Sequence, residues 1–340
     1  MNIVSDEKPS IAISKLKHAT EGKLKVVGVL SFTSECMCCA FNQQGQLLAV
    51  GLSNGLIKIY SIENNSYVYS LQEHSTTLPV TCLKWKPDKS AMTYGYILMA
   101  TYASGECKIW HVTTSKCLHT YTDNQQLLVC AYNGSGNKAI AGGSDGIINV
   151  YDVTTNQKIL RMQPSTNSDI MDGHVMRVFS VQYHPYDNHV FVSGGWDDTV
   201  QWWDTRISDK HSIKKISGPH ICGEAIDIEP NTLKMVAASW RKFENLQVFD
   251  FGTGKLIKDT PLKFNQSMLY CAQWKDSETI LSGGSHGNMM QCTHFSSFET
   301  VSKLTNLYGA VYSIDNNRVG LHPIVAVCSD KNVYLIESTS

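Results

Sequence analysis

The sequence lacks the features that mark membrane, secreted and nucleic-acid-binding proteins. No apolar run approaches the roughly 18 to 20 residues that a membrane-spanning helix needs, and the first ten residues are not an apolar signal segment. Neither charge sign is in excess, because 29 Lys and Arg face 30 Asp and Glu for a formal net charge of −1. This balance excludes the electrostatic footprint of a DNA- or RNA-binding protein. The absences together favour an intracellular protein, cytoplasmic or nuclear, that has no membrane segment.

Recognisable catalytic motifs are also missing. No spacing joins a nucleophile to a base or pairs two carboxylates, and no Gly-rich loop precedes a helix. Two G-x-S-x-G matches, at 142–146 and 283–287, resemble the nucleophile elbow of hydrolases, which requires a strand-to-helix turn. Because both matches stand between predicted strands, we interpret them as ordinary turns. We therefore expect neither enzyme activity nor a cofactor.

The cysteines do not form a metal-binding pattern. Their number, eleven, is odd, and most lie inside apolar strand patterns, where a reduced cysteine behaves as a small hydrophobic residue. A C-x-x-C occurs at 36–39, but alternate residues of a strand point to opposite faces, so Cys36 and Cys39 would not converge on one ion. No second pair with metal spacing follows. We predict that the protein binds no metal.

What the sequence does contain is one spacing of ten residues that recurs seven times. In each pair, a small residue that closes an apolar run lies ten positions before an aromatic or apolar residue. The pairs are Val50 and Tyr60, Ala100 and Trp110, Ala141 and Tyr151, Ser193 and Trp203, Ser239 and Phe249, Ser282 and Cys292, and Ala326 and Ile336. A fixed period of this kind indicates a repeat architecture. We predict an N-terminal arm over 1–23 and a single repeat domain over 24–340.

The copy at 174–216 shows what one repeat is. Apolar runs at 178–183, 190–195 and 199–204 are separated by turn residues, and a weaker run follows near 212–213. Short runs bounded by turns predict strands rather than helices, so each copy is a four-stranded antiparallel meander. One such sheet cannot bury both of its faces alone. Radial packing of seven copies predicts an all-β, seven-bladed β-propeller.

The last copy is one strand short. Only three strand patterns fit between 309 and 340, whereas each of the other copies supplies four. An apolar run at 24–30 precedes the first full copy. We predict that this N-terminal strand completes the last blade and closes the ring.

The strongest copy resembles the WD-repeat family at four signature positions. These are Gly173-His174, Ser193, Asp197 and Trp203-Asp204. The resemblance extends over roughly 24–338 and implies a buried network of His174, Ser193, Asp197 and Trp203, which is stabilising only when every member has a partner. Other copies depart from this pattern.

Two of the departures fall at the turn aspartate. The copy that ends at Cys292 has His286 at this position, and the copy that ends at Phe249 has Phe243. The resemblance therefore implies no complete network in these two copies, although the ten-residue spacing survives in both.

The resemblance implies a fold more firmly than a function, because propellers host many roles that depend on the site they carry. We expect a non-enzymatic scaffold or adaptor that captures a peptide or domain on one face. Its partners would be other proteins or peptides, without nucleic acid or membrane. The propeller itself would be a monomer within larger complexes.

Irregular turns predict where such a partner binds. The link at 163–172 is longer than its equivalents, Trp196 occupies the neighbouring turn, and residues 240–243 replace the Gly-Gly-x-Asp of other copies. Aromatic and Arg residues are common interface anchors, and this group suits an acidic or aromatic peptide. The predicted partner-binding residues are Tyr102, Met171, Arg177, Trp196, Trp240, Arg241, Lys242 and Phe243. A ring of such groups around the propeller axis would admit one side chain of a bound tail.

A less specific interpretation of these residues stays open. Trp196 and Trp240 would then cover the junction between two blades, and Arg241 and Lys242 would be ordinary solvated side chains.

A W-D-x-R pattern at 203–206 suggests a second function. It resembles the box of WD-repeat substrate receptors of cullin-RING ubiquitin ligases, and this resemblance implies that Arg206 contacts the ligase adaptor. The same residues occur in propellers that have no such role, because a basic residue after a third strand is ordinary surface chemistry. We keep the receptor as an alternative, and an enzyme with a site in the central channel as a more distant one.

Overall fold

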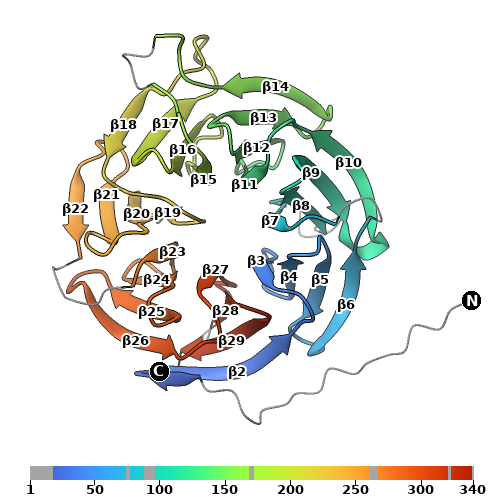
Figure 1. Ribbon diagram of the computed structural model, residues 1–340, viewed down its shortest axis with the longest axis vertical. Coiled ribbons are helices and arrows are strands. Elements are labelled where there is room, and N and C mark those ends of the chain that lie inside the picture. Colours follow the sequence, from blue (N-terminus) through green and yellow to red (C-terminus); the bar gives the residue numbers. More distant parts are fainter. Residues whose placement is uncertain are drawn as a thin grey trace, which may run out of the picture.

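The computed structural model describes residues 18–73, 77–87, 96–167, 172–260, 267–320 and 323–338. Seven antiparallel sheets, each one blade, are arranged in a ring, as Figure 1 shows. Cavities lined by residues of the innermost strands lie along the central axis, which we call the channel. Apart from one 3-10 turn, η1 (Val112–Thr114), all regular structure in the described ranges is strand. The predicted all-β, seven-bladed propeller is confirmed.

Each blade contributes one strand to the wall of the channel and one to the rim of the ring. The innermost strands are β3 (Cys36–Phe41), β7 (Val80–Trp85), β11 (Leu127–Tyr132), β15 (Val178–Tyr183), β19 (Ile226–Ile228), β23 (Leu269–Trp274) and β27 (Val311–Asn316). The second strands are β4 (Leu47–Leu52), β8 (Ile97–Tyr102), β12 (Lys138–Gly143), β16 (Val190–Gly195), β20 (Lys234–Ala238), β24 (Thr279–Gly284) and β28 (Ile324–Ser329). The third strands are β5 (Ile57–Ser61), β9 (Glu106–His111), β13 (Ile148–Asp152), β17 (Thr199–Asp204), β21 (Leu246–Asp250), β25 (Met289–His294) and β29 (Asn332–Ser338). The outermost strands are β6 (Ser66–Leu71), β10 (Lys116–Thr122), β14 (Gln157–Met162), β18 (Lys214–Ser217), β22 (Leu256–Asp259), β26 (Glu299–Thr305) and β2 (Leu24–Ser31).

The N-terminal strand closes the ring, as predicted. β2 pairs antiparallel with β29 from Leu24 opposite Ser338 to Ser31 opposite Asn332, and so supplies the fourth strand of the last blade. The sequence did not predict β1 (Ala19–Glu21), which pairs with β26 as a fifth strand of the sixth blade. The segment that precedes β2 therefore joins the sixth and seventh blades at the outer rim.

Burial explains why the strands differ in their sequence patterns. Second strands such as β4 and β16 are buried at nearly every position, because the neighbouring blades cover both faces of the sheet. Outer strands such as β6 and β14 have several exposed residues. Continuous apolar runs therefore mark the inner part of each blade, and mixed runs mark its rim.

The ten-residue spacing does not mark equivalent positions in every blade. In the first four blades the last pair between the second and third strands joins residues six positions apart, as in Gly194 opposite Val200. In the fifth blade the last pair is Ala238 opposite Leu246, eight positions apart. The predicted substitution of fixed turn positions by 240–243 is therefore wrong. These residues belong to a loop that is two residues longer, and the added length lets their side chains project.

Side chains on the innermost strands connect neighbouring blades at three of the junctions. Asp227 on β19 accepts a hydrogen bond from the backbone N–H of Trp274 at 2.9 Å, and Asp315 on β27 accepts one from Phe41 at 2.6 Å. The Ser180 hydroxyl accepts the N–H of Ile226 in the same way, at 3.1 Å. These bonds satisfy backbone groups that no sheet ladder reaches.

None of the described segments contains a helix with the length and apolar character needed to cross a lipid bilayer.

Candidate partner-binding face and central channel

The two faces of the ring are distinguished by strand direction. On the face that we call upper, the innermost strands begin, and the second and third strands are joined by turns. On the lower face, the innermost strands turn into the second strands.

The four residues assigned to a network by the family resemblance are connected in the fourth blade. His174 Nδ1 lies 2.8 Å from Asp197 Oδ2, and its Nε2 lies 2.7 Å from Ser193 Oγ. Trp203 Nε1 donates to the same oxygen at 2.7 Å. Burial raises the pKa of Asp197, but the hydrogen bond from His174 and that from Thr199 Oγ1 hold the pKa below its ordinary value. The turn of this blade is thus fixed by a fully hydrogen-bonded chain.

Tyr102 belongs to the interior rather than to the partner-binding face. Its side chain is only 1% exposed at the end of β8, and its hydroxyl accepts a hydrogen bond from Trp110 Nε1 at 3.3 Å. The prediction that Tyr102 shares the binding face is wrong. The error arose because a tyrosine beside a turn was assumed to point outward, whereas here it provides an acceptor for a buried indole.

Arg206 lies on the lower face, after β17, with about half of its side chain exposed. Its Nε and Nη2 atoms donate to the carboxylate of Asp204, at 2.9 and 2.6 Å, and Nη2 also donates to Asp187 at 3.1 Å. The hydrogen bond to Asp204 raises the pKa of Arg206 above its ordinary value. Two acidic neighbours therefore hold the guanidinium in place.

The remaining predicted partner residues gather on the upper face of the fourth and fifth blades. Trp240 is 38% exposed and Phe243 50% exposed in the β20–β21 loop, and Lys242 beside them is exposed. Arg241 forms an ion pair with Asp198 across the blade junction at 2.9 Å. Met171 lies outside the described residues.

Asp198 connects the tight turn of the fourth blade to the loop of the fifth. Its backbone is left-handed, with φ of 59°, a conformation that a short polar side chain tolerates better than most. One carboxylate oxygen lies 2.6 Å from His220 Nδ1, while the other receives Arg241. These contacts hold the His220 ring between the indoles of Trp196 and Trp240, at centroid distances of 6.3 and 6.5 Å.

Six aromatic rings form a continuous series across the upper face, from the fourth blade to the seventh. We call this series the aromatic arc. In order, its members are Phe179, Trp196, His220, Trp240, Tyr270 and Tyr312. Successive ring centroids are 5.0 to 6.5 Å apart, which is the range of favourable aromatic contacts. Sequence reasoning found only the two tryptophans.

The ends of the arc reach the channel because of a repeated β-bulge. In six blades the pairing of the innermost with the second strand skips the second residue of the innermost strand. The skipped residues, which we call the bulge ring, are Met37, Thr81, Leu128, Phe179, Tyr270 and Tyr312. Each is at least partly exposed between two buried neighbours. A bulge redirects a side chain in this way, here toward the channel mouth.

The bulge ring lines a cavity of about 160 Å³ at the upper mouth of the channel, which we call the upper cavity. Its walls are mostly apolar, and Glu224 and Cys222 contribute polar atoms. Cys222 Sγ accepts a hydrogen bond from Trp196 Nε1 at 3.0 Å, and burial raises the pKa of the thiol to about 11. The thiol is therefore neutral at physiological pH, so the cavity remains largely uncharged near Trp196.

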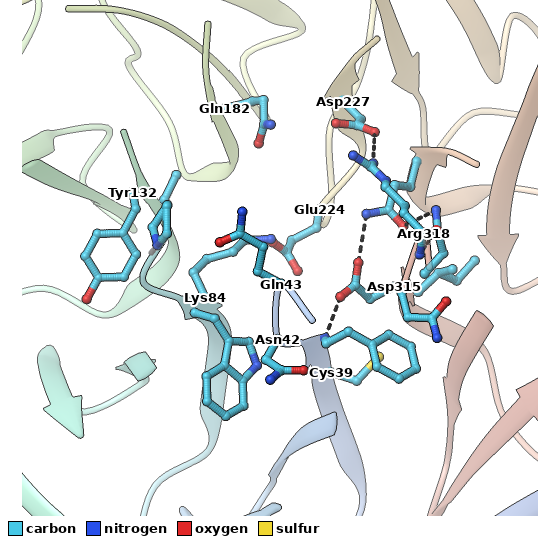
Figure 2. A pocket seen from close by; sticks show the side chains of 18 of the residues that line it. Cys39, Asn42, Gln43, Lys84, Tyr132, Gln182, Glu224, Asp227, Asp315 and Arg318 are labelled. Atoms are coloured by element: carbon cyan, nitrogen blue, oxygen red, sulfur yellow. Dashed lines mark hydrogen bonds and ion pairs between the residues drawn. The ribbon is translucent and has the colours of Figure 1, made fainter. Parts of the chain in front are cut away.

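A larger cavity of about 460 Å³ opens on the lower face. Figure 2 shows Lys84, Gln182, Glu224 and Asp315 around it. Lys84 Nζ lies 2.5 Å from Glu224 Oε1, and Glu224 lines both cavities, so this ion pair stands between them. Burial lowers the pKa of Lys84, but the Glu224 carboxylate more than offsets this effect and holds the pKa well above its ordinary value.

Titratable groups do meet in the channel, and their hydrogen bonds are structural. Burial raises the pKa values of Asp227 and Asp315, and both carboxylates accept backbone N–H groups of the neighbouring blade. Arg318 donates to Asp227 at 3.2 Å, and Glu224 pairs with Lys84. Within the described ranges, no group of three or more His, Cys, Asp or Glu residues is arranged to hold a metal ion.

The sequence contains a signal for the bulge ring, but simple alternation of strand residues between two faces does not reveal it. Phe179, Tyr270 and Tyr312 each stand second in an innermost strand, immediately after a buried aliphatic residue. Simple alternation assigns this position to one face of the blade, between neighbouring blades. Comparison of the same position in all repeats would have identified it as a separate set.

Comparison with family models identifies repeat units between residues 25 and 204. The model described as "Anaphase-promoting complex subunit 4 WD40 domain" matches residues 25–88 and 67–132. The model described as "WD domain, G-beta repeat" matches residues 115–152 and 165–204. The second model thus includes the complete network of the fourth blade.

Curated relatives are similar to the chain at low identity. Periodic tryptophan protein 2 homolog of Caenorhabditis elegans is 24% identical over 67% of this chain and 26% of its own length. APC/C activator protein CDH1 of Saccharomyces cerevisiae is 25% identical over 81% of this chain and 45% of its own length. Mitotic checkpoint protein bub-3 of Caenorhabditis elegans is 27% identical over 49% of this chain and 46% of its own length. The chain therefore spans from about a quarter to just under half of these relatives.

Proposed function

Because the chain belongs to the WD-repeat β-propeller family, we propose that it is a non-enzymatic scaffold or adaptor whose upper face captures a peptide or domain of another protein. It would act as a monomeric propeller within a larger complex, in the cytoplasm or nucleus. A rigid scaffold suits this role, because little conformational entropy is lost when a partner binds to a surface that is already ordered.

The aromatic arc is the observation that carries this proposal. Its members Trp240 and Tyr312 remain 38% and 44% exposed, and Phe243, in the same loop as Trp240, remains 50% exposed. Large aromatic side chains and Arg commonly supply most of the binding energy of protein interfaces. The names of the relatives support the same role, since one is an APC/C activator protein and another a mitotic checkpoint protein.

The proposal predicts that truncating the centre of the arc releases the partner. We expect the double variant Trp240→Ala/Arg241→Ala to lose its specific partners in affinity purification, or to bind a purified partner about tenfold or more weakly. The measurement is quantitative mass spectrometry of proteins captured from lysate by wild type and variant.

A matched variant on the lower face controls for nonspecific effects. Tyr186→Ala removes a ring that is 70% exposed after β15, and it should leave the partners unchanged. Circular dichroism establishes that all three proteins are folded. Identical partner profiles for wild type and the double variant would contradict the upper-face proposal.

The fixed orientation of the Arg206 guanidinium favours a second candidate function, that of a substrate receptor of a cullin-RING ligase. Asp204 and Asp187 fix the guanidinium on the lower face while about half of the side chain stays exposed. In this case Arg206→Gln would abolish association with a purified cullin adaptor while the melting temperature is retained. Absence of association in the wild type would eliminate this candidate.

A further inference from the structure

We propose that the upper cavity receives one apolar side chain of an extended partner segment, and that Arg177 binds a carboxylate up to about three residues from that side chain. This inference rests on the proposed function, because it names the chemistry of the segment that the upper face would capture. It also makes the channel mouth, rather than the exposed loop alone, the centre of the binding surface.

The cavity selects for an apolar anchor. Five of its bulge-ring residues are hydrophobic or aromatic, and Phe179, Tyr270 and Tyr312 supply rings from the fourth, sixth and seventh blades. A cavity of about 160 Å³ is close to the size that holds a benzene molecule in other proteins. A Leu or Phe side chain therefore matches its volume and its lining.

A cationic anchor is disfavoured at the same site. Glu224 is the only carboxylate lining the upper cavity among the described residues, and Lys84 already neutralises it at 2.5 Å from below. A second ammonium or guanidinium group at Glu224 would lie near the Lys84 charge. Like charges in such a partly desolvated site repel strongly.

Arg177 supplies the polar half of the recognition. Its guanidinium carbon lies 5.0 Å from the centre of the Trp196 ring, a stacking arrangement that fixes the side chain while its N–H groups stay available. Its side chain is exposed, and no carboxylate of the described residues forms an ion pair with it. Arg241, by contrast, is already paired with Asp198. A partner carboxylate would form a bidentate, charge-assisted pair of hydrogen bonds with the Arg177 guanidinium.

The geometry limits the spacing between the two groups. The Arg177 guanidinium stacks on Trp196 at 5.0 Å, and the Trp196 centroid lies 5.4 Å from that of Phe179, which lines the cavity. These two steps together span at most about three residues of an extended chain at roughly 3.3 Å each. The recognised unit is therefore an acidic residue and an apolar residue up to about three positions apart.

Defined peptides test this inference directly. The probe is fluorescein-labelled Gly-Asp-Ser-Gly-Leu-Ser-Gly, with a Phe-for-Leu version and a version in reversed order, titrated by fluorescence anisotropy to about 1 mM protein. Control peptides carry Ser in place of Leu or Lys in place of Asp. We expect at least one Asp-containing peptide to bind about tenfold more tightly than both of its controls.

Two protein variants separate the halves of the site. Arg177→Gln should weaken the Asp peptide about tenfold and should not weaken the Lys-for-Asp control. Leu128→Phe adds volume to the bulge ring, and should remove the advantage of Leu over Ser while the contribution of Asp persists. Tyr186→Ala, on the lower face, should change neither. Thermal melts establish that each variant is folded.

The inference is overturned if no Asp-containing peptide binds, if all peptides bind alike, or if the Lys-containing controls bind best. Its failure is distinguishable from failure of the proposed function. If Trp240→Ala/Arg241→Ala still releases the partners but the peptides do not bind, the upper face captures a partner of different chemistry. If the partner profiles are identical, the upper-face function itself fails.

Discussion

At the scale of residues, the buried indoles of Trp203 and Trp110 find hydrogen-bond acceptors in two different ways. Trp203 Nε1 donates to Ser193 in the fourth blade, within a chain that continues to His174 and Asp197. Trp110 occupies the same strand position in the second blade, and its Nε1 donates to Tyr102. A buried polar atom without a partner costs about 1–3 kcal/mol. The second blade therefore keeps an acceptor for its indole although the family pattern is lost there.

We predict that Asp197→Asn reduces the free energy of unfolding by about 1–3 kcal/mol near neutral pH. The pKa of Asp197 is lower in the folded protein than its ordinary value of 3.8, so the stabilisation that it provides is complete above that value. It is lost as the pH falls below 3.8 toward the lowered folded-state pKa. The stability gap between wild type and variant should therefore narrow from about pH 5 to about pH 3.

Urea denaturation at each pH measures this gap. Asp209→Asn, which changes an exposed carboxylate after β17, is the matched control and should give little difference at any pH. A gap that stays constant down to about pH 3 would contradict the assignment of the stabilisation to ionised Asp197.

At the scale of elements, the strands and their closure could be predicted from the sequence because each depends on local pattern and on counting. Continuous apolar runs identified the second strands, and the missing strand of the last copy identified β2 as its partner. Each conclusion follows from burial on both faces of a blade and from the need to pair an exposed edge.

The proposed binding face was harder to predict, because it depends on register rather than on composition. Alternation within one strand does not reveal the bulge that turns Phe179 and Tyr312 toward the channel, and strand pairing or comparison across the repeats is needed. The longer β20–β21 loop was hidden because Ser239 happens to lie ten residues before Phe249, although Ser239 lies beyond the end of β20. A fixed spacing cannot distinguish a substitution from an insertion when residues of the expected type occur by chance.

We predict that removing β2 is far more damaging than removing β1. A chain that begins at residue 32 loses a strand that pairs with β29 along its whole length, which leaves the seventh blade with an unpaired edge. A chain that begins at residue 24 loses only β1, a three-residue strand whose side chains are all exposed. Thermal unfolding should show a decrease of about 10 °C or more for the first truncation and of only a few degrees for the second.

The shorter truncation is the control for the longer one, because both remove the same preceding segment. Equal melting temperatures for the two truncations would show that β2 does not close the ring. A large decrease already in the shorter one would show that β1 joins the sixth and seventh blades more strongly than its three pairs indicate.

At the scale of the whole molecule, each blade contacts its two neighbours, so the ring transmits its stability around the circumference. The Lys84–Glu224 ion pair is different, because it joins the second blade to the fifth across the channel. It lies between the upper and lower cavities, and its side chains are 35% and 24% exposed. The pair therefore couples parts of the ring that share no sheet and no direct blade junction.

We predict that removing either charge of this pair lowers the free energy of unfolding, and that the two losses are not additive. Lys84→Met leaves the Glu224 carboxylate partly buried without its cation, and should lower the free energy of unfolding by about 1–3 kcal/mol; Glu224→Gln should have a comparable effect. The double variant removes both charges, so its loss should be about 1 kcal/mol or more smaller than the sum of the single losses. Urea unfolding of the four proteins measures this coupling, and purely additive losses would show that the two blades are not linked through the channel.

The single variants also test the charge of the upper cavity. Because Lys84 neutralises Glu224, Lys84→Met should weaken binding of the Asp-containing peptide and strengthen binding of its Lys-containing control. Glu224→Gln should not produce that reversal.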